Sequence, residues 1–68
     1  MNFGEAIEAL KQGKRLTRPE WAGNNAFIAT YQEESGETTI GWQSDHHPRQ
    51  VYHPNTAEIL AEDWAEVA

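Results

Sequence analysis

Hydrophobic positions near the N-terminus recur at the spacing of an amphipathic helix. The apolar stripe follows i, i+3, i+4 and i+7 spacing: Phe3, Ala6, Ile7 and Leu10. Asn2 with Glu5 three positions later is typical of a capping box, and Gly13 suits the residue that follows a helix. The pattern predicts a helix over about Phe3 to Gln12.

After Gly13 the apolar positions alternate with the two-residue period of β-strands. Strands are predicted over four ranges: Lys14–Arg18, Ala26–Tyr31, Thr38–Trp42 and Trp64–Val67. Two segments have turn composition, Glu20–Asn25 and Gln32–Glu37. The polar segment Gln43–Gln50 is predicted to be irregular, and Val51–His53 a short extended piece.

A second capping pair precedes the last strand. Asn55 and Glu58 predict a helical turn over Thr56 to Glu62, with Ile59 and Leu60 directed inward. The predicted fold class is therefore α+β. An N-terminal helix packs on an antiparallel sheet of about four strands, and a short second helix precedes the final strand. No repeat or linker interrupts the pattern, so residues 1–68 are expected to form a single domain.

Composition adds a constraint on how such a chain holds a core. The chain has 68 residues, a formal charge of −6, three tryptophans and no cysteine, and eleven residues are Leu, Ile, Val or Phe. A domain of this size buries only about 60% of its unfolded surface. The missing cysteines exclude a disulfide framework and a thiolate zinc site. We expect Trp64 to lie in the core, and we expect self-association to supply part of the buried surface.

Charge and hydropathy exclude two classes of partner. The acidic total argues against polymeric nucleic acid, where neutralisation of phosphates supplies most of the affinity. No apolar run approaches the roughly 20 residues of a membrane span, so no membrane partner and a cytoplasmic location are expected. Four of the five basic residues cluster between Lys11 and Arg18, whereas the last twelve residues are acidic. These are either two faces that complement one another or a local anion site for a small phosphate-bearing ligand.

Metal and cofactor chemistry finds little support. His46, His47 and His53, with Asp45 alongside, are candidate ligands. Adjacent histidines in an extended segment point to opposite faces, and no helical His pair occurs. No metal site and no cofactor are predicted.

Catalytic patterns are equally sparse. Ser35 and Ser44 lie in predicted turns without a nucleophile-elbow sequence. Glu62 and Asp63 are adjacent carboxylates, which rarely face one pocket, and Asp63 is expected to orient the turn into the last strand. No catalytic residue is predicted, so the protein is not expected to be an enzyme.

Aromatic residues in polar segments are the remaining candidates for function. An indole face can stack on a base, side-chain amides can read its edges, and arginine can bind phosphate. The alternative is that the three tryptophans are all core, although Trp21, in a polar turn, is expected to be partly exposed or at an interface. The candidate binding residues are Trp21, Trp42, Tyr52, Arg18, Asn24 and Ser44.

Two blocks of the chain resemble a known family. Residues 2–23 (NFGEAIEALKQGKRLTRPEWAG) are similar to the opening of the Thoeris anti-defence sponge proteins of the second type. Residues 57–64 (AEILAEDW) resemble that family's closing motif. The two blocks occur in the right order and together cover about half of the chain.

The resemblance implies a function without catalysis. Members are small phage and prophage proteins that bind cyclic nucleotide immune signals, notably glycocyclic ADP-ribose isomers, and sequester them intact in the host cytoplasm. Some also bind cyclic dinucleotides at separate sites. They are homotetramers, dimers of dimers, with pockets between subunits.

By position, the resemblance assigns individual roles. Trp21 matches the ligand-stacking tryptophan, Phe3 a second aromatic wall, and Arg18 the family's arginine. Asp63 and Trp64 match the closing motif, whose role is mainly architectural.

The chain also departs from the family pattern. Glu20 stands beside Trp21 and would repel phosphate unless it points away or pairs with Arg18. Residues 25–53 show no match, so the ligand's other contacts are open. One alternative is an acidic interaction protein that inhibits a host protein by direct binding. A small hydrolase or metal protein is the third possibility.

Overall fold

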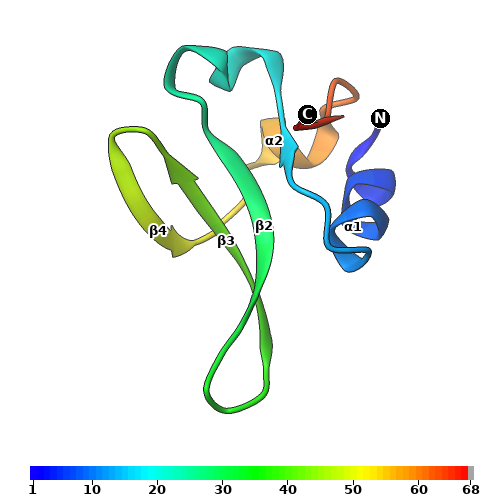
Figure 1. Ribbon diagram of the computed structural model, residues 1–68. Helices are drawn as coiled ribbons and strands as arrows, with labels where there is room; N and C mark the ends of the chain where they lie inside the picture. The colour runs from blue at the N-terminus through cyan, green and yellow to red at the C-terminus, as the bar shows by residue number, and fades with distance from the viewer. Residues whose placement is uncertain (68) are drawn as a thin grey trace.

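The computed structural model describes residues 1–67, which form a five-stranded antiparallel sheet with two α-helices (Figure 1). In chain order the elements are α1 (Phe3–Lys11), β1 (Leu16–Thr17), the 3₁₀ helix η1 (Pro19–Asn24), β2 (Phe27–Gln32), β3 (Thr38–Ser44), β4 (His47–Val51), α2 (Thr56–Leu60) and β5 (Ala65–Glu66). The strand order is β4-β3-β2-β1-β5. The α+β prediction is confirmed, and the sheet has one strand more than the four expected.

Both helices begin at the predicted capping boxes. Asn2 Oδ1 accepts the backbone N–H of Glu5 at 2.8 Å, and the Glu5 carboxylate accepts the Asn2 N–H at 2.8 Å. Asn55 and Glu58 repeat this exchange at 2.8 and 3.1 Å. Each box satisfies N–H groups that have no partner within the helix.

The two strands predicted on either side of the turn Gln32–Glu37 form the central hairpin. Strands β2 and β3 pair from Phe27 with Gln43 to Gln32 with Thr38. Gly36 in the connecting turn has φ +91°, a conformation that glycine adopts without steric cost. The predicted strand Lys14–Arg18 is shorter in the structure, because only Leu16 and Thr17 pair with the neighbouring strands.

Strand β4 is the element that the sequence pattern missed. The segment Gln43–Gln50 was predicted to be irregular, but a tight turn at Asp45–His46 folds it back as His47–Val51 on the edge of the sheet. Every residue of β4 is exposed, so the strand has no apolar alternation to reveal it. Pro48 is tolerated because an edge strand leaves part of its N–H row unpaired.

The core lies between α1 and the sheet and centres on one tryptophan. Its buried members are Ala6, Ala9, Leu10, Leu16, Ile28 and Trp64. Trp64 is 2% exposed, which confirms its predicted core role. The inward prediction for Ile59 and Leu60 is wrong, because these side chains are 46% and 72% exposed. Helix α2 spans only five residues, Thr56–Leu60, and buries none of them.

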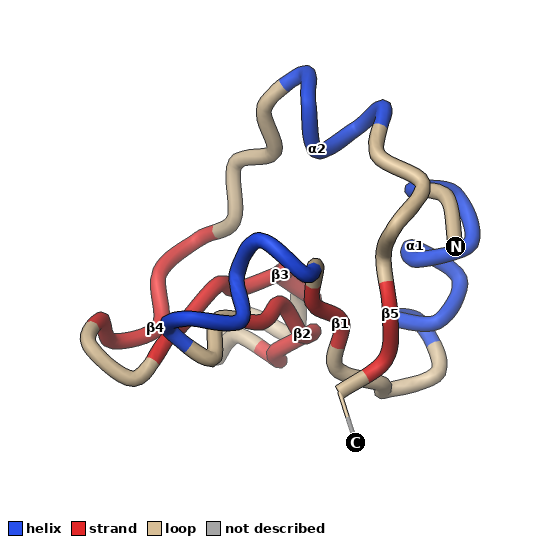
Figure 2. The backbone as a smooth tube through the Cα atoms, turned by 90° about the horizontal axis from the view of Figure 1, so that it is seen from above, coloured by secondary structure: helices blue, strands red, loops and turns tan. Residues whose placement is uncertain are grey.

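The last third of the chain leaves the sheet and returns to it. After β4 the backbone rises to α2 and comes back along β5 beside β1 (Figure 2). The N-terminus is bound to this returning segment: the Met1 amino group donates to the carbonyl oxygen of Trp64 at 2.7 Å. Within residues 1–67, neither helix has the length and apolar character needed to cross a membrane.

Candidate functional site

An aromatic cluster joins the N-terminal helix, the 3₁₀ helix and the C-terminal segment. Trp64 lies at its centre, with the Phe3 ring centroid 5.8 Å away and the Trp21 centroid 5.2 Å away, edge to face. Tyr52 extends the cluster, because its ring meets Trp21 edge to face at 6.4 Å. Such edge contacts each contribute about 0.5–1.5 kcal/mol beyond area burial. The cluster therefore assembles Phe3, Trp21 and Tyr52, three of the predicted binding residues.

Trp21 has one side in the core and another accessible to solvent. The 3₁₀ helix η1 starts at Pro19, whose fixed φ suits the first turn of a helix, and ends at Asn24. The cap residue that follows, Asn25, lies in the left-handed region with φ +52°. This short element holds the indole against Trp64 but leaves it half-buried. The prediction that Trp21 is partly exposed is confirmed.

Arg18 forms ion pairs within the same chain. Its Nε donates to Asp63 Oδ1 at 2.9 Å, its Nη1 pairs with Glu20, and its Cζ lies 5.9 Å from the centroid of the Trp64 ring. The hydrogen bond from Arg18 lowers the pKa of the Asp63 carboxyl below its usual range. Glu20 is thus paired with Arg18. In this arrangement the Glu20 carboxylate is offset by the guanidinium and does not repel a phosphate at Trp21.

The basic cluster of the sequence is largely neutralised by acidic residues. Lys14 pairs with Glu66 at 2.8 Å and Lys11 with Glu8 at 3.7 Å, while Arg18 pairs with Asp63. Of the two alternatives for these charges, the structure favours complementary faces over a local anion site.

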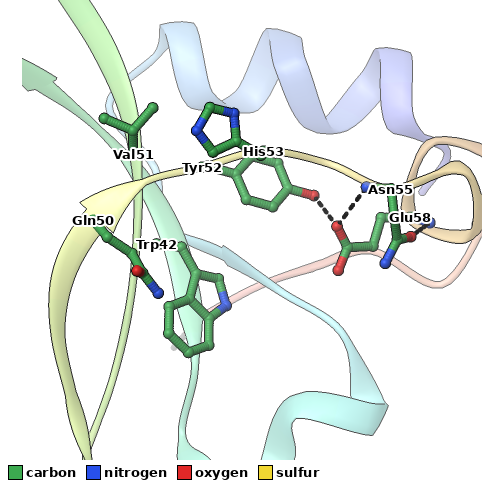
Figure 3. Close-up of a pocket in the computed structure, with 7 residues that line it drawn as sticks. All are labelled: Trp42, Gln50, Val51, Tyr52, His53, Asn55 and Glu58. Carbon is green, nitrogen blue, oxygen red and sulfur yellow. Dashed lines mark hydrogen bonds between the residues drawn. The ribbon is translucent and has the colours of Figure 1, made fainter.

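A pocket of about 300 Å³ opens beside this aromatic cluster, between β3, β4 and α2 (Figure 3). Two of the predicted residues, Trp42 and Tyr52, form part of its wall. The sequence pattern does not indicate the other lining residues as a site: Gln50, Val51, His53, Asn55 and Glu58. The spacing of Asn55 and Glu58 predicts only a helix cap. The one indication in the sequence that this cap borders a cavity is the candidate binding residue Tyr52, three positions before Asn55.

A shared carboxylate oxygen organises one wall of the pocket. Tyr52 donates its O–H to Glu58 Oε1 at 3.0 Å, and the Asn55 backbone N–H donates to the same oxygen at 3.1 Å (Figure 3). Burial, reinforced by the bond to Glu58, raises the pKa of Tyr52 well above its usual range. Tyr52 therefore remains a neutral hydrogen-bond donor at all physiological pH values.

The remaining predicted residues lie near the β3–β4 turn, outside the pocket lining. Ser44 Oγ is 3.1 Å from His47 Nδ1 and accepts the His46 N–H at 3.3 Å. The backbone carbonyl oxygen of Asn24 accepts the backbone N–H of Asp45 at 3.0 Å, which connects η1 to this turn. Neither Asn24 nor Ser44 is brought together with Tyr52. The Ser44–His47 bond belongs to an exposed turn.

Potential metal ligands do not gather in the described structure. Among residues 1–67, no three His, Asp or Glu side chains are grouped closely enough to hold a metal ion. His47 instead lies against Trp42, with ring centroids 5.7 Å apart.

The fold and site together define a small α+β domain with an aromatic cluster and an adjoining open pocket. Comparison of the sequence with known families gives a match to the Thoeris anti-defense 2-like domain over residues 1–67, and the chain belongs to this family. The protein called Thoeris anti-defense 2 from Bacillus phage SP01 is 27% identical over 81 aligned residues. The alignment covers 94% of this chain and 91% of the phage protein. The resemblance noted from the two terminal blocks is confirmed.

Proposed function

We propose that this protein binds and sequesters a cyclic nucleotide immune signal, a glycocyclic ADP-ribose isomer or a cyclic dinucleotide. By removing the signal it blocks Thoeris or related anti-phage signalling in a host bacterium. One observation carries the proposal: half-buried Trp21 packs on Tyr52, and Tyr52 together with half-buried Trp42 lines an open pocket. Aromatic rings that keep one face accessible are platforms for nucleobases. The name of the phage relative supports the anti-Thoeris role.

The proposed action is stoichiometric binding without cleavage. The pocket's polar groups are arranged to form hydrogen bonds: Tyr52 is a neutral phenol, and Glu58 already accepts two bonds on one oxygen. The ligand is held by stacking and hydrogen bonds and is released unchanged when the protein unfolds.

Self-association completes the proposed site. A pocket of about 300 Å³ is at the lower end of the range for small-molecule sites, so part of a cyclic nucleotide extends beyond it. The exposed Ile59 and Leu60 on α2 favour burial against another copy. We propose a homotetramer, a dimer of dimers, in which a second subunit contacts the remainder of the ligand.

Isothermal titration calorimetry tests the binding function directly. The unmodified protein is titrated with glycocyclic ADP-ribose isomers and with cyclic dinucleotides, and one of them is expected to bind. Trp21→Ala is expected to weaken that binding about tenfold or more, since stacking contributes about 1–3 kcal/mol per base. Lys11→Gln, which changes an exposed ion pair on α1, is the control. Absence of heat and of thermal stabilisation across the panel contradicts the proposal.

Mass spectrometry of the bound ligand separates binding from turnover. After the complex is denatured by heat, the ligand is expected to be recovered with its original mass. Recovery of a hydrolysed product would instead establish a hydrolase. If no ligand binds and a host protein is retained through the Glu62 face, the protein acts as an acidic interaction partner. Light scattering that shows a monomer contradicts the shared pocket.

A further inference from the structure

The Glu58 carboxylate has one oxygen engaged and one oxygen available. Oε1 accepts both the Tyr52 O–H and the Asn55 N–H. Within the described residues 1–67, Oε2 takes part in no hydrogen bond or ion pair. In Figure 3 both dashed lines end on the same carboxylate oxygen. The two donors hold the carboxylate in one orientation, so Oε2 is a positioned hydrogen-bond acceptor on the pocket wall.

Charge restricts what this acceptor can meet. The residues that line the pocket include Glu58 but no lysine or arginine. The nearby Arg18 is already paired with Asp63 and Glu20. A phosphate in the pocket would face the Glu58 carboxylate with the His53 imidazole, and no lysine or arginine, to offset it, and like charges at short range repel. The occupant therefore presents an N–H or O–H donor here and keeps its phosphates outside.

The other lining groups favour a planar ring over a simple amine. Trp42 provides a half-buried indole, and Gln50, its partner in the β3–β4 register, carries an amide that can both donate and accept. Figure 3 shows the Gln50 amide beside the Trp42 ring, with Tyr52 and Glu58 across the pocket. Ring nitrogens of a base can accept from the Gln50 amide, whereas an ammonium ion has no acceptor to offer.

We propose that this pocket is the subsite for an adenine ring of the ligand, with Trp42 as the stacking surface and Glu58 as the specificity-determining residue. Glu58 Oε2 accepts a hydrogen bond from the exocyclic amino group. Tyr52 and Asn55 are positioning residues, because they act on the base only through Glu58. This inference rests on the proposed nucleotide-binding function. It adds which part of the ligand enters the pocket and which feature of the base is read.

The assignment of Glu58 to the exocyclic amino group is tested by changing both partners. The ligand's amino group is replaced by a carbonyl oxygen, and the Glu58 carboxylate is replaced by an amide. Calorimetry compares an adenine-containing cyclic dinucleotide with its hypoxanthine counterpart, in which a carbonyl oxygen replaces the amino group. The unmodified protein is expected to prefer adenine about tenfold, because hypoxanthine leaves the carboxylate facing an acceptor. Glu58→Gln keeps one oxygen for Tyr52 and Asn55 and places an amide donor at the other position. In Glu58→Gln the preference for adenine is expected to disappear or to reverse in favour of hypoxanthine.

Controls separate the subsite from fold and from overall binding. Glu62→Gln, an exposed carboxylate outside the pocket lining, is expected to retain the adenine preference. Trp42→Ala is expected to weaken the binding of both ligands to the same extent. This variant tests the pocket even if Glu58→Gln fails to fold. An unchanged preference in Glu58→Gln, or unchanged affinity in Trp42→Ala, overturns the subsite while the binding function stands. If the unmodified protein binds no cyclic nucleotide, both proposals fail.

Discussion

Arg18 Nε donates a hydrogen bond to Asp63 Oδ1 at 2.9 Å, across 45 positions of the chain. The same two segments meet again where Trp21, three residues after Arg18, packs edge to face on Trp64, the residue after Asp63. The two blocks that resemble the family's opening and closing motifs are thus two halves of one structural unit. Their joint occurrence in the sequence reflects a contact in the fold.

The Arg18–Asp63 pair makes stability depend on pH in the acid range. The folded state lowers the pKa of Asp63, chiefly through the hydrogen bond from Arg18, so the unfolded chain takes up a proton first as pH falls. The stabilisation is complete above the ordinary aspartate pKa of about 4 and is lost as pH falls through the lower folded value. Asp63→Asn is expected to be less stable than the unmodified protein at neutral pH, and this difference is expected to shrink below about pH 4.

Urea unfolding at a series of pH values measures this difference. Glu62→Gln is the matched control, because Glu62 adjoins Asp63 but its carboxylate is exposed and is not part of an ion pair within residues 1–67. A stability difference for Asp63→Asn that stays constant from neutral pH to pH 3 would contradict the role of the ion pair.

The Tyr52–Glu58 bond predicts the opposite behaviour at alkaline pH. Burial and the bond to Glu58 raise the pKa of Tyr52 in the folded state. The resulting stabilisation is fully present below the unfolded tyrosine pKa of about 10 and decreases as pH rises toward the folded value. Tyr52→Phe is expected to cost about 1–2 kcal/mol at neutral pH, because a hydrogen bond to a charged acceptor is removed. Unfolding free energies at pH 7 to 11 should show the two proteins converging above pH 10, and a constant gap would refute the assignment.

Gly41 is a position where the sheet has no room for a side chain. A Cβ there would lie 2.8 Å from Tyr31 Cε2 and 2.9 Å from Arg49 Cγ. The Tyr31 ring is held in place by Arg49, 4.1 Å from its centroid, and by the bond from its O–H to Gln43 at 2.6 Å. Gly41→Ala is expected to destabilise the protein by about 1–3 kcal/mol.

Thermal unfolding with a second glycine variant checks the steric argument. Gly23, on η1, would meet no atom within 4 Å after addition of a Cβ. Gly23→Ala is therefore expected to leave the melting temperature nearly unchanged. Equal melting temperatures for Gly41→Ala and the unmodified protein would show that the Tyr31 ring moves aside without cost.

The exposed residues of α2 predict where copies of the chain associate. Leu60 is 72% exposed, and burying such a side chain contributes about 1.5–3 kcal/mol. Leu60→Ser is expected to weaken self-association about tenfold or more in sedimentation equilibrium. Lys11→Gln is the control, because it changes an exposed ion pair on α1 and removes no exposed apolar side chain. Unchanged association in Leu60→Ser would contradict an interface at α2.

Local spacing determined a large part of the fold. The starts of α1 and α2 followed from side chains that hydrogen-bond to backbone N–H groups three positions away, as at Asn2 and Asn55. The central hairpin followed from the two-residue alternation of strands that bury one face. These features depend on residues close together in sequence, so the chain alone contains the necessary information.

Long-range packing decided the rest. Strand β4 exists because the backbone of β3 offers hydrogen bonds to it, and an exposed edge strand needs no apolar pattern. Ile59 and Leu60 are exposed although α2 is attached to the core by the bond from the indole N–H of Trp64 to the Glu58 carbonyl, because no described element covers these two side chains.

The site shows the same division between sequence and structure. The sequence alone identified Trp21, Trp42 and Tyr52 as aromatic residues in polar surroundings. Only the tertiary structure placed Tyr52 against Trp21, paired Arg18 with Asp63, and turned the cap residue Glu58 toward the pocket. These contacts join segments far apart in the chain, and their geometry is set by how a small core closes around Trp64.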